Sequence, residues 1–195
     1  MATSDSRKTV RIGVFIPTEA QLLDTACIDV FGSMSYEYQS GLSYMIPETI
    51  YSLAPSVSIS YISTIKPGEL IRLTGSMKVA CTHHLSDPEV QPGQLDIVLI
   101  PGPDPRTAWE AAVTDWVAGH AATEGTDILS VCSGIFVCGA AGILKGKKAC
   151  GPRGLQSQLK KQFEDVTWLG DELRWIQDGN IWSSGTVSPF FSSRV

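Results

Sequence analysis

The chain has 195 residues, of which 43% are hydrophobic and 18% are charged. This length and composition are ordinary for one globular domain with a sizeable core. The net charge of −5 and the lack of a Lys/Arg stripe argue against a nucleic-acid partner. No apolar run approaches the roughly 20 residues that a membrane span needs. The polar first ten residues lack the apolar region of a signal peptide, so we expect a cytoplasmic protein that does not contact a membrane.

The chain contains five cysteines, an odd number, and none of them forms a Cys-x-x-Cys pair. Without an export signal, this favours reduced thiols. His83 and His84 are adjacent, a spacing that does not match known zinc motifs. We therefore expect neither a metal nor another cofactor.

The first half of the chain mixes strand and helix patterns. Residues 10–16 form an apolar run rich in β-branched residues, which predicts a buried strand. Apolar residues at helical spacing predict a helix from Asp24 or Thr25 to Tyr38. We then expect a loop that holds at most a short turn of helix over 39–56, a strand over 57–63 and a hairpin arm over 70–79.

The second half of the chain begins with a strong strand pattern at 94–100, which runs directly into a rigid Pro-Gly-Pro loop. A strand then precedes Cys132, and an apolar helix follows it. The remaining expected elements are helices at 107–122 and 156–163, a loop at 149–154, and strands at 166–169, 173–176 and 181–184, the last two joined by a turn at Asp178, Gly179 and Asn180.

Alternating apolar strands and helices indicate an α/β sandwich around a mostly parallel sheet. In such a sheet, ligands bind at the carboxyl ends of the strands. Three segments deliver reactive or turn-forming residues to those ends, namely 19–24, 101–103 and Cys132. Asp24 is either a cap of the following helix or a carboxylate that faces this crevice.

Small residues surround Cys132 in the pattern Ser130-x-Cys132-x-Gly134. This spacing is typical of a nucleophile elbow, in which a reactive side chain projects from a tight strand-to-helix turn. The N-terminal end of the helix favours a thiolate, so we expect a lowered pKa for Cys132. The alternative interpretation is an inert buried cysteine between a core strand and a core helix. Cys150 lies in a loop that could approach the same site.

Several segments resemble the DJ-1/PfpI (ThiJ) superfamily over roughly residues 10–185. They are IPGP after a strand, SVCSGIFVCGAAGILKGKKA and the hairpin RWIQDGNIWSSG. The resemblance implies a flavodoxin-like three-layer sandwich that forms one domain over 1–195, with 1–9 as a flexible lead. The last ten residues, 186–195, do not match the apolar C-terminal helix usual in the family, so we expect a chain that lacks it.

Within that family, EAQLLDTACIDVFG resembles the isonitrile hydratase branch, whereas glyoxalase or deglycase branches usually carry Glu at the acidic position. The resemblance assigns Cys132 as nucleophile, Asp24 as acid and Ser133 as the residue after the nucleophile. It also implies Gly102, Pro103 and Gly134 as substrate-binding or oxyanion positions. Since proline has no N–H, Pro103 removes a donor that the family's usual Pro-Gly-Gly supplies.

No histidine follows His120 in the sequence. A Cys–His dyad of the amidotransferase type therefore requires His83, His84 or His120 to approach Cys132 from elsewhere in the fold.

The resemblance implies that a small-molecule isonitrile is hydrated to an N-substituted formamide through a Cys132 thioimidate, with Asp24 relaying the proton. Three alternatives stay open. They are glyoxalase III or deglycase activity on 2-oxoaldehydes, another lyase step on a specialised metabolite, and a redox sensor that is not an enzyme. The family resemblance also implies a homodimer.

Overall fold

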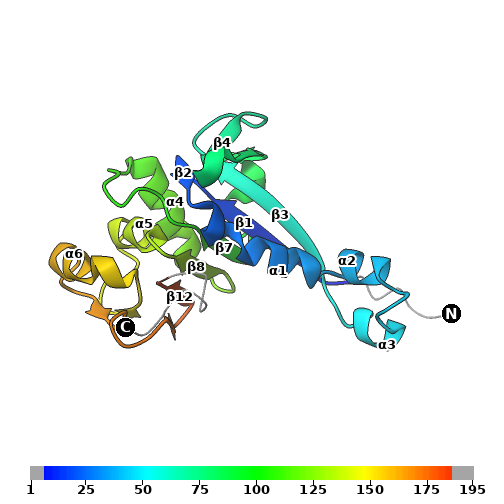
Figure 1. The fold of residues 1–195 in the computed structure, drawn as a ribbon. Helices are drawn as coiled ribbons and strands as arrows, with labels where there is room; N and C mark the ends of the chain where they lie inside the picture. Colours follow the sequence, from blue (N-terminus) through cyan, green and yellow to red (C-terminus); the bar gives the residue numbers. More distant parts are fainter. Residues whose placement is uncertain (1–6, 186–195) are drawn as a thin grey trace.

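The computed structural model describes residues 7–185, and its centre is a seven-stranded sheet (Figure 1). The strand order is β11-β12-β8-β7-β1-β3-β6, and every pairing is parallel except that of β11 with β12. The strands are β1 (Thr9–Phe15), β3 (Ser56–Ser63), β6 (His83–His84), β7 (Ile97–Ile100), β8 (Asp127–Val131), β11 (Trp175–Asp178) and β12 (Ile181–Ser184).

Each face of the sheet packs in its own hydrophobic cluster, because successive side chains of a strand point to opposite faces. Val98 and Ile100 pack with α4 (Ala111–Ala121), α5 (Gly134–Ala140) and α6 (Gln156–Gln162). Leu99 packs on the other face with α1 (Cys27–Ser33) and a small sheet of β2 (Glu19–Ala20), β4 (Leu70–Leu73) and β5 (Lys78–Ala80). The predicted flavodoxin-like sandwich is confirmed.

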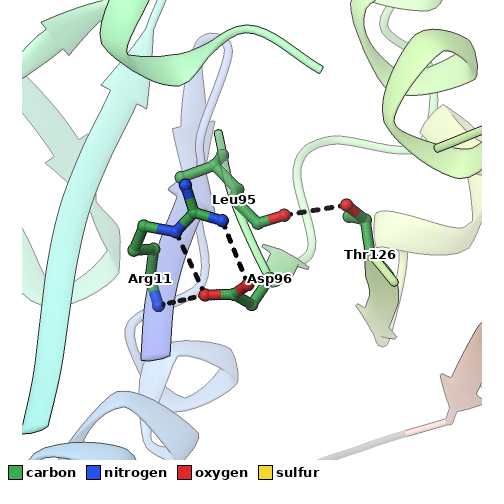
Figure 2. A network of polar contacts seen from close by, with 4 residues as sticks. All are labelled: Arg11, Leu95, Asp96 and Thr126. Atoms are coloured by element: carbon green, nitrogen blue, oxygen red, sulfur yellow. Dashed lines mark hydrogen bonds and ion pairs between the residues drawn. The ribbon is translucent and has the colours of Figure 1, made fainter. Parts of the chain in front are cut away.

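Figure 2 shows how the ends of three central strands are tied together. Asp96 accepts hydrogen bonds from the Arg11 backbone N–H at 2.7 Å and from its guanidinium at 3.1 and 3.2 Å. The Thr126 hydroxyl donates to the Leu95 carbonyl at 2.8 Å. These contacts precede β7 and β8, at the amino ends of the strands, so they fix the sheet at the edge opposite to the carboxyl ends.

The prediction of a single helix up to Tyr38 is wrong, because this segment is interrupted at two places. A 3₁₀ turn (Leu22–Thr25) precedes α1, and α2 (Tyr36–Gly41) follows it as a separate helix. Ser35 is extended, and its hydroxyl accepts from the Tyr38 N–H at 3.1 Å. This N-cap starts a new helix instead of continuing the old one. The short helical turn expected in the next segment is α3 (Glu48–Tyr51).

In the second half, the helix expected from 107 begins only at Ala111, because Glu110 is extended. Trp109 therefore lies before the helix, although it packs against the same core. The loop predicted at 149–154 begins one residue too early, since β9 (Lys148–Ala149) pairs with β10 (Thr167–Trp168) in a separate two-stranded sheet. The terminal hairpin is confirmed, with β11 two residues later than predicted.

The prediction of a flexible lead over 1–9 is wrong for residues 7–9, since β1 begins at Thr9. Arg7 donates to the backbone carbonyls of Ser52 and Ala54 at 3.0 and 2.7 Å and lies over the Tyr36 ring. Residues 1–6 and the atypical tail at 186–195, with its expected lack of a helix, lie outside the described residues. One domain over 1–195 stays a prediction.

Burial of His120 should make stability depend on pH. Its ring is fully buried, packs at a tilt against the Trp116 ring and shares a hydrogen bond with the Val90 carbonyl. Burial lowers the pKa of His120 below its usual 6.5, so the unfolded chain takes up a proton at a higher pH than the folded chain. The free energy of unfolding is therefore highest above about pH 6.5 and decreases as the pH falls. The expected decrease is about 1 kcal/mol at pH 5.5.

Urea unfolding between pH 7.5 and 5.5 measures this loss. His120→Gln should flatten the pH dependence, whereas His84→Gln on the edge strand β6 should leave it intact. An equal slope in the wild type and in His120→Gln would contradict the prediction.

Candidate active site

Cys132 lies on the turn between β8 and α5 with a backbone φ of 56°. A side chain other than glycine in this left-handed region costs of order 1–3 kcal/mol and is found mainly at functional sites. The backbone N–H of Cys132 donates to the Ser184 carbonyl of β12 at 2.9 Å, which holds the strained residue in place. The predicted nucleophile elbow is thus present, with a half-buried thiol at the carboxyl end of the sheet.

Asp24 is buried, with 3% of its surface exposed, and it lies beside the elbow. One oxygen of its carboxyl group accepts from the Gly102 N–H at 3.2 Å, and the carboxyl also contacts the Cys132 thiol. Its side chain caps no helix. Of the two interpretations of Asp24, the structure therefore favours the carboxylate that faces the crevice.

Gly102 is the point at which three segments meet. A Cβ atom at this position would lie 2.5 Å from the Asp24 Oδ2 atom, 2.6 Å from the Ser133 Oγ atom and 3.1 Å from the Ser133 nitrogen. Only glycine allows this approach. Since the Gly102 N–H already donates to Asp24, the role of Gly102 as an anion donor stays a prediction.

Ser133 joins the elbow to the neighbouring loop. Its buried hydroxyl donates to the Pro103 carbonyl at 2.6 Å instead of capping α5. Its backbone N–H faces the Cys132 sulfur and lowers the pKa of the thiol. Pro103 thus serves as an acceptor. The amide of Ser133 is thus a donor that faces the Cys132 sulfur.

Gly134 packs the elbow against the end of β7. A Cβ atom here would collide with the Ile100 carbonyl oxygen, so the close approach of α5 to β7 requires glycine. This packing contact is sufficient to explain why position 134 is a glycine. The oxyanion role expected for Gly134 stays a prediction.

The predicted lowering of the Cys132 pKa is wrong. Burial, followed by the negative charge of Asp24, raises the pKa of the thiol to about 11, which outweighs the effect of the Ser133 N–H. Burial likewise raises the pKa of Asp24, against the lowering effects of Cys132 and Gly102. The resting pair therefore keeps its proton on the sulfur, next to a carboxylate that can accept it.

The described residues form no Cys–His dyad. His83 and His84 are on β6, the edge strand four positions from β8 in the sheet, and His120 is buried against Val90. Cys150 is fully buried, and its backbone N–H donates to the Ser183 hydroxyl at 2.9 Å. Burial raises the pKa of Cys150. All five cysteines are free thiols.

An open groove of about 450 Å³ begins at Gly102 and Pro103. One wall is the loop that continues to Arg106, and the other comes from β2, β4 and the residues next to them. The loop wall includes Asp104 and Arg106, two charged residues that the sequence allows at a pocket mouth. The sequence analysis missed the contribution of β4, because four residues with a single charge, Arg72, between apolar neighbours do not reveal the pairing with β2.

Within residues 7–185, no helix is long and apolar enough to cross a membrane. The same part of the chain holds no group of three or more His, Cys, Asp or Glu side chains suited to a metal ion.

Gly102→Ala should disturb the site, because its methyl group must push Asp24 and Ser133 aside. We expect a loss of about 1–3 kcal/mol in the free energy of unfolding, measured by urea titration. Gly32→Ala is the matched control, since no atom lies within 4 Å of a Cβ atom there. This control should be neutral or slightly stabilising. Equal effects of the two substitutions would show that the contact at Gly102 is not tight.

Asp24→Asn should increase the reactivity of Cys132, because it removes the negative charge that raises the pKa of the thiol. If this pKa falls by one, the thiolate fraction at pH 8 rises about tenfold. The rate of iodoacetamide labelling, followed by mass spectrometry, measures the change. Slower labelling than in the wild type would show that Asp24 activates the resting thiol instead of suppressing its ionisation.

Comparisons with known proteins identify relatives in sequence and in fold. The chain is 29% identical over 127 residues to Deglycase PfpI of Pyrococcus furiosus, covering 64% of this chain and 71% of the relative. The fold is similar to that of Drosophila melanogaster DJ-1beta, with a TM-score of 0.64 and 16% identity over 91% of this chain and 82% of that chain.

A putative transcriptional regulator from Vibrio parahaemolyticus is similar in fold, with a TM-score of 0.65 and 19% identity over 91% of this chain and 84% of that chain. The model of the DJ-1/PfpI family matches residues 44–192, a range that includes Cys132, Ser133 and Gly102 but not Asp24. This chain therefore belongs to the DJ-1/PfpI family.

Proposed function

We propose that the chain is a cysteine-dependent enzyme that converts 2-oxoaldehydes to 2-hydroxy acids. The observation that carries this proposal is the contact of the Cys132 thiol with the buried carboxyl of Asp24. Similarity to Deglycase PfpI supports carbonyl chemistry of this kind. The reaction needs no external oxidant or reductant, since it adds water and moves hydrogen within the substrate.

In the first step, the Cys132 sulfur bonds to the aldehyde carbon and its proton passes to Asp24. Asp24 then gives this proton to the aldehyde oxygen, so a hemithioacetal results and the carboxylate is restored. The Ser133 N–H lies where it can stabilise the charge that develops on that oxygen. Because the resting thiol keeps its proton, transfer to Asp24 accompanies attack.

In the second step, Asp24 takes the proton from the former aldehyde carbon while the neighbouring carbonyl oxygen takes up a proton, so an enediol forms. Asp24 then gives its proton to the neighbouring carbon, and the hydroxyl on the former aldehyde carbon loses a proton. The product of this step is a thioester of the 2-hydroxy acid. Water then cleaves the bond between sulfur and carbon and restores the thiol. The sum is R–CO–CHO plus water giving R–CHOH–COO⁻ and a proton, so atoms and electrons balance.

The isonitrile hydratase prediction gains no support from the matched proteins. It rests on the resemblance of the segment around Asp24 alone. The same pair could add a thiol to an isonitrile carbon, and for this reason an isonitrile belongs in the functional assay.

A homodimer stays part of the proposal. Much of the exposed apolar surface belongs to residues 22–53, where α1, α2 and α3 contribute no fully buried side chain. Figure 1 shows α2 and α3 at the opposite end of the molecule from α6. Apolar side chains exposed in this number are common at protein interfaces.

A cytoplasmic location is likewise only proposed.

Purified full-length protein should consume methylglyoxal and release lactate. Cys132→Ser should abolish turnover, and Asp24→Asn should lower it by about 100-fold or more although its thiol ionises more readily. Cys81→Ser, a buried thiol away from the elbow, is the matched control and should keep full activity.

Hydration of an isonitrile without turnover of methylglyoxal would replace this proposal with isonitrile hydratase. If neither compound reacts and Cys132 gains two oxygens at low peroxide concentration, the redox interpretation takes its place.

A further inference from the structure

The groove that begins at Gly102 has charged side chains on both walls. On the loop wall, the Arg106 guanidinium and the Asp104 carboxylate form an ion pair at 2.6 Å. The Arg106 backbone N–H and its Nε atom also donate to Asp104, at 2.9 and 3.0 Å. The opposite charges of this pair neutralise each other, so the pair adds no net charge to the loop wall.

The opposite wall carries Arg72 on β4 and Glu19 on β2. The two residues are in register on parallel strands, and both line the groove. Among the described residues, Arg72 makes no ion pair and its side chain donates no hydrogen bond to another side chain or carbonyl. Its planar guanidinium therefore keeps its donors free, and such a group binds carboxylates through two parallel hydrogen bonds.

The groove adjoins the catalytic residues at Gly102, which lines it and also contacts Asp24 and Ser133. The far end of a substrate whose reacting carbon lies at Cys132 would lie on this side of Gly102 and Pro103. Of the two arginines that line the groove, Arg106 is paired with Asp104 and Arg72 has no ion-pair partner among the described residues, so Arg72 is the group we expect an anionic substituent to contact. Glu19, next to Arg72, repels the same substituent.

We infer that the groove between β2, β4 and the 102–106 loop binds the far end of the substrate, and that Arg72 selects 2-oxoaldehydes bearing a carboxylate. This inference rests on the proposed function for the reacting group, and it adds the substrate class and the residue that recognises it. Glu19 limits the strength of the interaction, so the two residues make opposite contributions to carboxylate binding.

Labelling of Cys132 tests the inference without requiring turnover. The two probes are N-iodoacetyl-β-alanine, which carries a carboxylate, and N-propyl iodoacetamide, a neutral reagent of similar length. The ratio of their labelling rates measures the preference for a carboxylate. Arg72→Gln should lower this ratio about fivefold, the range expected for a solvent-exposed ion pair, and Glu19→Gln should raise it.

Lys78→Gln on β5 is the matched control, because Lys78 pairs in register with Arg72 but does not line the groove. It removes the same charge and should leave the ratio unchanged. High salt should reduce the preference of the wild type but not affect Arg72→Gln. An unchanged ratio in Arg72→Gln, or an equal fall in Lys78→Gln, would overturn the inference.

Turnover of 4,5-dioxopentanoate and of neutral 2-oxopentanal separates this inference from the proposed function. Arg72→Gln should lower kcat/KM about fivefold for the first and leave it unchanged for the second. If neither is turned over, the proposed function fails while the labelling ratio still decides the inference. If both are turned over with no effect of Arg72→Gln, the inference fails and the proposed function stands.

Discussion

The hydrogen bond from the Gly102 N–H to the Asp24 carboxyl joins two segments 78 residues apart in the chain. Because Gly102 also contacts Ser133, this approach determines where the 3₁₀ turn, the loop after β7 and the elbow lie relative to one another. The Arg11–Asp96 contacts fix the other end of the same sheet. The amino ends of the strands are thus held firmly, and the reactive groups come together at the carboxyl ends.

Burial has opposite consequences for stability and for chemistry at this site. Burial raises the pKa of both Asp24 and Cys132, so two acidic groups share an apolar space that favours a single negative charge. A folded chain with a carboxylate there is less stable than one with an uncharged side chain. The same low polarity favours the transfer of the thiol proton to Asp24 that the proposed reaction needs. Such a loss of stability in return for activity is common in active sites.

Much of the fold could be predicted from the sequence, because continuous apolar strands and the elbow glycines leave few alternatives. Cys132, Asp24 and the 101–103 loop were expected at one edge, and they lie there. The helix break at Ser35 was missed because one hydroxyl overrides an otherwise helical pattern. The raised pKa of Cys132 depends on tertiary burial, which a local pattern does not contain, and Arg72 reaches the groove only through the pairing of β2 with β4.

The left-handed backbone of Cys132 has a consequence for how this position can change over generations. Glycine is the residue that adopts this conformation without strain, so a chain released from any need for a thiol would gain of order 1–3 kcal/mol by losing it. Selection for stability alone would therefore favour glycine at position 132. Cysteine at this position costs the fold stability, which agrees with the chemical role that we propose for its thiol.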